Sequence, residues 1–84
     1  MNIDLLIKMA NEIGSFFTTA TAEQASRDVA THLKRYWEPR MRQQIIRYLD
    51  ERHGAGLSDV ARGAVEQLKA ESAAAGAASG AGKP

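Results

Sequence analysis

The sequence contains no cysteine, which removes the usual ways of cross-linking a very small domain. Disulfide bonds, thiolate-held zinc and iron–sulfur clusters all require cysteine, and His32 and His53 lie too far apart to form a helical ligand pair. A folding unit of about 70 residues buries only about 60% of its unfolded surface, which yields roughly 3–5 kcal/mol of stability. We therefore expect no cofactor or metal ion bound by this chain, and stabilisation by a partner.

Long apolar runs and a strong net charge are also missing. Lys8 and Glu12 interrupt the apolar N-terminal segment before it reaches the length of a membrane span, and no basic leader or small-residue cleavage site precedes it. The formal net charge of +1 does not by itself imply nucleic acid or an anionic membrane surface, although it excludes neither. We predict a cytoplasmic protein that makes no contact with a membrane.

The residue groupings that catalysis requires are absent from the sequence. A nucleophile needs a nearby base, and a general acid–base pair needs two groups that converge in a cleft. His32 has Asp28 and Glu38 as neighbours in the sequence, but their spacings do not form a triad. The glycines near the C-terminus have no preceding strand and no following helix, so they do not form a phosphate loop. We predict no catalytic residue in this chain.

The sequence does contain apolar residues at intervals of three and four, without strict alternation or a hairpin signal. The predicted fold class is all-α: a small bundle of four short helices over residues 1–70, followed by a disordered Ala/Gly-rich tail over residues 71–84. The helices are expected over residues 3–17, from residue 21 to the break at Pro39, over residues 39–53, and from residue 58 onward within the domain that ends at residue 70. Their inward residues would be Leu6, Met9, Ala10, Ile13 and Phe17; Ala22, Ala25, Val29, Leu33 and Tyr36; Met41, Ile45, Tyr48 and Leu49; and Leu57, Val60, Ala61, Ala64, Val65 and Leu68.

Helix start and stop signals support these boundaries. Thr21 and Gln24 form a capping-box pattern, and Ser58 can cap the last helix. Pro39 separates the second helix from the third, because it lacks an N–H yet fits the first position of a helix. Gly54 is a plausible left-handed residue at the end of the third helix.

The first helix has more apolar surface than one core requires. Its polar residues fall inside an arc of roughly 100°, whereas the apolar arc is roughly 200° wide and a helix lying on one core needs only about 100°. Either one side meets a partner, or the helix sits centrally and its own chain covers both sides. Ile45 and Ile46 give the third helix a similar excess. The polar residues of the first helix are Asp4, Lys8, Asn11, Glu12 and Ser15.

The segment from His32 to Arg42 concentrates the only tryptophan and four cations around a proline. One interpretation is an interhelical corner, in which Trp37 fills the space between two diverging helices and the arginines are solvated. The other is a docking corner, in which Arg40 and Arg42 hold a partner's carboxylates or carbonyls in bidentate fashion.

Nucleic-acid binding is the rival class. Residues 27–52 hold seven basic and four acidic residues. On the third helix, Arg40, Gln43, Gln44 and Arg47 share a face that could contact bases or phosphates. The charge run is modest, however, and the junction around Pro39 differs from the short glycine-bearing turn of a helix-turn-helix. We therefore interpret this polar face as solvated, and a small helical DNA- or RNA-binding module remains the alternative function.

Three stretches closely resemble the delta subunit family of cytoplasmic NAD-dependent, molybdenum- or tungsten-containing formate dehydrogenases. They are residues 9–17 (MANEIGSFF), 32–42 (HLKRYWEPRMR) and 54–57 (GAGL), and the likeness spans about residues 2–68. The resemblance implies a large catalytic subunit that carries bis-molybdopterin guanine dinucleotide and iron–sulfur clusters, with diaphorase subunits that hold FMN and pass electrons to NAD. It also implies that the delta subunit holds no redox centre and supports assembly, cofactor maturation or stability.

The apolar excess and the resemblance together predict a non-catalytic accessory subunit that binds the large catalytic subunit, and neither nucleic acid nor membrane. We expect the partner interface to combine the first helix with the proline corner, with Phe16, Phe17 and Trp37 as apolar contacts and Arg40 and Arg42 as directional ones. The predicted interface residues are Ile3, Ile7, Phe16, Phe17, Trp37, Pro39, Arg40, Arg42 and Ile46.

Overall fold

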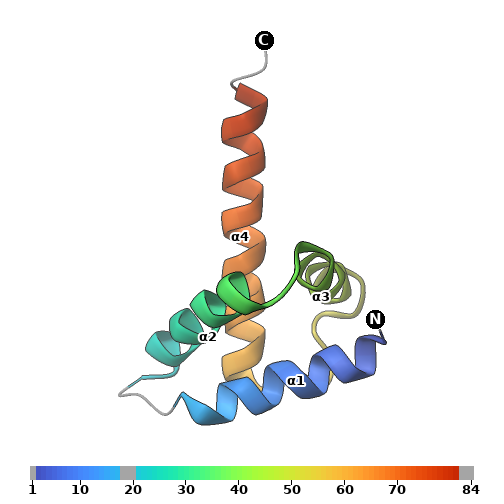
Figure 1. Cartoon of the computed structure of the whole chain (residues 1–84), viewed down its shortest axis with the longest axis vertical. Helices are drawn as coiled ribbons and strands as arrows, with labels where there is room; N and C mark the ends of the chain where they lie inside the picture. Colours follow the sequence, from blue (N-terminus) through green and yellow to red (C-terminus); the bar gives the residue numbers. More distant parts are fainter. Residues whose placement is uncertain (1, 18–20, 82–84) are drawn as a thin grey trace.

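The structure, a computed structural model, describes the backbone of residues 2–17 and 21–81 and the side chains of these residues as far as Ala73. Its elements are α1 (Ile3–Phe16), α2 (Ala22–Tyr36), α3 (Pro39–Arg52) and α4 (Asp59–Ala81), and these described residues contain no strand. The all-α prediction of four helices is confirmed. In Figure 1, α4 stands upright between α2 and α3, and α1 crosses near the first turns of α4.

Two predicted caps are present in the structure. The Thr21 hydroxyl accepts a hydrogen bond from the Gln24 backbone N–H at 3.0 Å, and the Ser58 hydroxyl accepts one from the Ala61 N–H at 3.2 Å. Pro39 is at the start of α3, as predicted, where its missing N–H costs nothing. These local signals set where α2, α3 and α4 begin.

The turn between α3 and α4 is held by a side chain of α1. His53 and Gly54 both adopt left-handed backbone angles, with φ of 57° and 70°, so the chain reverses direction just after α3. The Asn11 amide donates to the Gly56 carbonyl at 2.9 Å, and its oxygen accepts from the Ser58 N–H at 2.8 Å. Asn11, which the sequence places on the polar arc of the first helix, therefore fastens α1 to the start of α4.

The core lies where α2 packs against α4, with α1 and α3 closing its sides. Its largest fully buried side chains are Leu6, Leu33, Ile45, Val29 and Val65. Two residues predicted to face inward do not do so, since Ala22 and Tyr36 are exposed. At the end of α2 the buried stripe continues from Leu33 to Trp37, four residues on, and this rotation leaves Tyr36 outside.

Small residues allow α2 and α4 to approach closely. The buried Ser26 hydroxyl donates to the Val60 carbonyl at 2.9 Å. A Cβ added at Gly63 would lie 2.4 Å from the Ser26 oxygen and 3.0 Å from its Cβ, which is closer than atoms can pack. Glycine at position 63 is therefore required by the spacing of the two helices.

The fourth helix continues past residue 70, where the predicted helical domain ends, since α4 extends to Ala81. Alanine has the highest helix propensity, which favours continuation of the helix through the Ala-rich segment. Lys34 of α2 bonds to Glu71 at 2.6 Å, and Lys69 of α4 pairs with Asp50 of α3. Beyond these ion pairs α4 extends away from the other helices (Figure 1). Of the predicted tail, residues 82–84 lie outside the described residues.

Two glycine substitutions test the close packing of α2 on α4. Gly63→Ala should lower the free energy of unfolding by about 1–2 kcal/mol, because the clash with Ser26 exceeds the gain in helix propensity. Gly14→Ala is the matched control: its added Cβ would meet neighbours at 3.5–3.8 Å, an ordinary contact distance. Its unfolding free energy should be unchanged or up to about 1 kcal/mol higher. Urea unfolding followed by circular dichroism measures both, and equal effects would contradict the packing argument.

Candidate interaction surfaces

The predicted interface residues do not form one continuous surface. Phe16, Pro39 and Arg40 are exposed, whereas Trp37 is buried, with 5% of its surface accessible. The remaining residues are half-buried, and they are Ile3, Ile7, Phe17, Arg42 and Ile46. Ile7 and Ile46 pack against the core. The structure distributes the other residues among three places: an aromatic surface on α1 and α2, the corner between α2 and α3, and a groove between α1 and α3.

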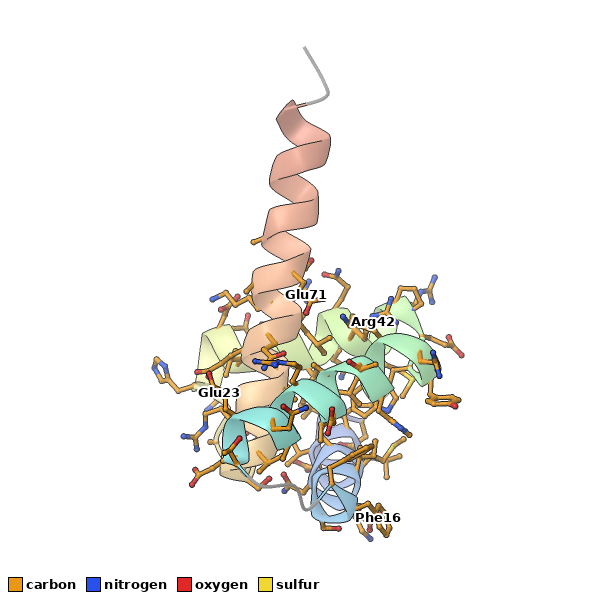
Figure 2. The ribbon with its side chains drawn as sticks, turned by 90° about the vertical axis from the view of Figure 1, so that its left-hand side faces the viewer. Phe16, Glu23, Arg42 and Glu71 are labelled. Atoms are coloured by element: carbon orange, nitrogen blue, oxygen red, sulfur yellow. The ribbon has the colours of Figure 1, made fainter. Side chains whose placement is uncertain are left out.

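The first place, which we call the α1–α2 surface, consists of the contacting rings of Phe17, His32 and Tyr36 together with two exposed residues of α1, Phe16 and, about three turns before it, Leu5. Leu5, Phe16 and Tyr36 are 44%, 79% and 66% exposed. Phe17 meets His32 edge to face, with ring centroids 5.9 Å apart, and the His32 ring lies 4.6 Å from that of Tyr36. In Figure 2 the Phe16 side chain lies at the edge of the molecule, beside the end of α1. Large apolar side chains from two helices are thus left in solvent.

The second place, the corner around Pro39, is held together by internal contacts. One nitrogen of the Arg42 guanidinium donates to the Lys34 carbonyl at 3.0 Å and to the Trp37 carbonyl at 2.7 Å. Carbonyl groups at the end of a helix lack hydrogen-bond donors within the helix, and Arg42 supplies donors to those at the end of α2. Because Trp37 is buried and Arg42 is engaged, neither offers the free contact surface that the docking interpretation requires. The structure favours the interhelical corner.

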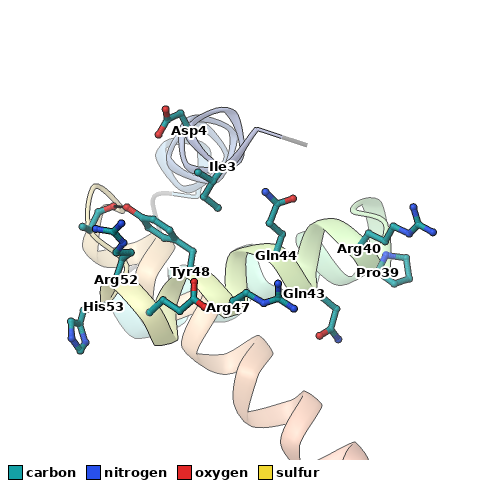
Figure 3. Close-up of a pocket in the computed structure, with 12 residues that line it drawn as sticks. Ile3, Asp4, Pro39, Arg40, Gln43, Gln44, Arg47, Tyr48, Arg52 and His53 are labelled. Atoms are coloured by element: carbon teal, nitrogen blue, oxygen red, sulfur yellow. Dashed lines mark hydrogen bonds between the residues drawn. The ribbon is translucent and has the colours of Figure 1, made fainter.

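The third place, which we call the α1–α3 groove, brings Ile3, Pro39 and Arg40 together. It is an open depression between the first turn of α1 and the length of α3, and Gln43, Arg47 and Tyr48 also line it (Figure 3). The polar face predicted on the third helix therefore borders a groove. Ile7 and Ile46 pack against the core instead and do not line it.

Sequence reasoning missed two exposed residues of the α1–α2 surface. Leu5 was placed within the wide apolar arc, but nothing in the spacing showed which part of that arc would stay uncovered. Tyr36 was assigned to the core because positions 36 and 37 both lie close to the periodic stripe of α2. The corner interpretation of the sequence, in which Trp37 fills the space between the two helices, is the one that the burial of Trp37 supports.

The described part of the chain contains neither a metal-binding cluster nor a membrane-spanning helix. Among these residues no three His, Asp or Glu side chains are arranged to hold a metal ion. Within the same residues, no helix combines the length and apolar character needed to cross a membrane.

Comparison with known families assigns the chain to one of them. The family model described as NADH-dependent formate dehydrogenase delta subunit, FdsD, matches residues 5–65. The chain belongs to this delta subunit family. The match runs from the first turn of α1 into α4, so all three surfaces lie largely within the family's own sequence. No curated protein and no solved structure matches the chain. Membership confirms the resemblance drawn from the sequence motifs and identifies the delta subunit as part of a formate dehydrogenase.

The two arginines of the corner should behave differently when truncated. Arg42→Ala removes donors to two carbonyls at the end of α2 and should lower the free energy of unfolding by about 1–2 kcal/mol. Arg40→Ala, two residues away and exposed, should change it by less than about 0.5 kcal/mol. Urea unfolding of the isolated delta subunit compares the two. A stable Arg42→Ala variant would show that the internal hydrogen bonds contribute little and would return Arg42 to the list of free contact residues.

Proposed function

We propose that this delta subunit is a non-catalytic accessory subunit that binds the large molybdenum- or tungsten-containing catalytic subunit of a cytoplasmic NAD-dependent formate dehydrogenase. Binding would support assembly of the complex, maturation of its cofactor, or its stability. The proposed contact is the α1–α2 surface, with Phe16 at its centre. Family membership supports the claim that the partner belongs to a formate dehydrogenase complex. The exposed aromatic side chains support the claim that the contact lies on the α1–α2 surface.

The observation that carries the proposal is the exposure of Phe16 and Tyr36 in a chain whose core is small. Burying an aromatic or leucine side chain contributes roughly 1.5–3 kcal/mol, so leaving three such side chains in solvent forgoes stability that a small domain needs. Aromatic residues are enriched where protein interfaces derive most of their binding energy. A partner that covers Leu5, Phe16 and Tyr36 would recover this energy on binding.

The residues present do not suit the iron–sulfur clusters expected in the holoenzyme. Iron–sulfur clusters require thiolate ligands, and the sequence has no cysteine. We propose that bis-molybdopterin guanine dinucleotide and the iron–sulfur clusters are held by the large subunit, and FMN and the NAD site by the diaphorase subunits. The delta subunit would then act on these groups only through the polypeptide that binds them.

The predicted interface is accordingly revised to the side chains that the structure leaves accessible. Phe16 and Phe17 belong to the α1–α2 surface, to which Leu5 and Tyr36 are added. Trp37 and Arg42 are left out because they support the fold. The remaining predicted residues either line the α1–α3 groove or pack beside it against the core.

Substitution of the exposed aromatic residues tests the proposal. Phe16→Ser combined with Tyr36→Ser should abolish co-purification with the large subunit, since each lost contact weakens an interface by about 1–3 kcal/mol, or roughly fivefold to 150-fold in affinity. The unfolding free energy of the isolated chain should change little, because both side chains are exposed. The readout is the amount of large subunit recovered through a tag on this chain.

Glu23→Ser combined with Thr31→Ser is the control, because both residues are exposed on α2 but neither belongs to the α1–α2 surface. The control pair should leave recovery unchanged. Full recovery of the large subunit with the aromatic double variant would show that this surface does not make the contact.

A further inference from the structure

We infer that the α1–α3 groove is a second docking site, and that it binds an acidic peptide segment with aliphatic side chains supplied by a partner polypeptide. This inference rests on the proposed function only for the identity of the polypeptide that supplies the segment. The groove itself is defined by contacts within the chain and shares no residue with the α1–α2 surface.

The floor of the groove combines apolar side chains with the amide of Gln44, which projects from α3 toward Ile3 (Figure 3). Figure 3 shows Ile3 of α1 and Tyr48 of α3 directed into the space between the two helices. The Tyr48 hydroxyl donates to the Ala55 carbonyl at 2.6 Å, which holds the ring across one end of the groove. Pro39 provides an apolar surface at the other end. Apolar side chains of this kind contribute binding energy to aliphatic groups of a ligand and little to a purely ionic one.

The rim of the groove carries mixed charge, with one more cation than carboxylate. Arg40, Arg47 and Arg52 line it together with two carboxylates, Asp4 and Glu51. Three positive and two negative groups leave a formal excess of one positive charge, before any contribution from a histidine. Within the described residues the ion pairs join Lys34 to Glu71 and Lys69 to Asp50, so none of these arginines is engaged in one. Their guanidinium groups are available for carboxylates, which they can bind in bidentate fashion.

The spacing of the arginines constrains the geometry of the ligand. Arg40 and Arg47 are seven residues apart on α3, two turns, or about 10.5 Å along the helix axis. Carboxylates two turns apart on a helical segment, or about three residues apart on an extended one, span the same distance. The exposed amide of Gln43 lies between them in the sequence and can bond to the backbone of a segment lying there.

The same features disfavour a nucleic acid as the occupant. Nucleic-acid affinity comes mainly from neutralising many phosphates, and it needs a cationic surface without interruptions. Here Asp4 and Glu51 stand among three arginines, so the rim lacks the continuous positive surface that a phosphate backbone requires. A peptide can direct its carboxylates at the arginines and its N–H groups at the carboxylates of the rim, so mixed charge suits it better.

Site-specific photocrosslinking in the assembled formate dehydrogenase tests the inference. A benzophenone amino acid replaces Gln43 in the groove, Phe16 in the α1–α2 surface, or Glu23 as a control outside both. We expect the probe at position 43 to join a partner segment that contains Asp or Glu next to Leu, Ile or Val, identified by peptide mass spectrometry. A crosslink from position 16 without one from position 43 would overturn the groove site and leave the proposed function intact. Failure of this chain to co-purify with the large subunit would instead sink the proposed function.

Charge reversal provides a second and independent readout. Arg40→Glu with Arg47→Glu should weaken binding of the complex by about tenfold, because two attractive pairs become repulsive. Arg27→Glu with Arg35→Glu makes the same change in net charge at exposed positions of α2 and should have no comparable effect. Equal losses from the two pairs would show a general charge effect and overturn the site. So would tighter, more salt-sensitive binding of the isolated chain to a single-stranded oligonucleotide than to a Glu/Leu-rich peptide.

Discussion

The close contact between α2 and α4 is the constraint from which the rest of the structure follows. Gly63 leaves room for Ser26, and the Ser26 hydroxyl is bonded to the Val60 carbonyl. This contact fixes the rotation of α2, so that Leu33 and then Trp37 enter the core while Tyr36 is turned outward. The Arg42 guanidinium of α3 then donates to the Trp37 carbonyl at the end of α2. This hydrogen bond ties the first turn of α3 to the corner.

A core built by close approach of small residues leaves little room for large ones. Ala25, Ala30, Ala61 and Ala64 are all buried, whereas Trp37 is the only buried residue among the five aromatic residues of the sequence. Phe17 and Tyr48 cover its edges, and Phe16 and Tyr36 remain outside. The two interpretations of the wide apolar arc of α1, coverage by its own chain and coverage by a partner, therefore each apply to part of it. One portion of it is covered by the chain, and the portion around Leu5 and Phe16 is not.

Helix boundaries could be predicted from the sequence where they depend on residues that are neighbours along the chain. Thr21, Ser58 and Pro39 act within one turn of the residues they affect, so their roles were predicted correctly. The role of Asn11 was not, because its partners at Gly56 and Ser58 are brought near only by the fold. The choice between Tyr36 and Trp37 depended on the rotation of α2 against α4, which periodicity determines only to within one residue. The end of α4 was missed because high alanine content favours a helix even where nothing packs against it.

The same constraint links the stability of this delta subunit to its role in the complex. A ligand that binds only the folded state raises its stability in proportion to the logarithm of ligand concentration over dissociation constant, so a partner stabilises a small domain most when it is abundant. If both proposed contacts form, they strengthen this coupling, because once one has formed the other binds at a high effective concentration. An aromatic surface beside α2 and an arginine-lined groove beside α3 would place such contacts on both sides of α1, and Asn11 ties α1 to the turn before α4. Covering both would therefore fix the orientation of α1 and reinforce the small core that α1 helps to close.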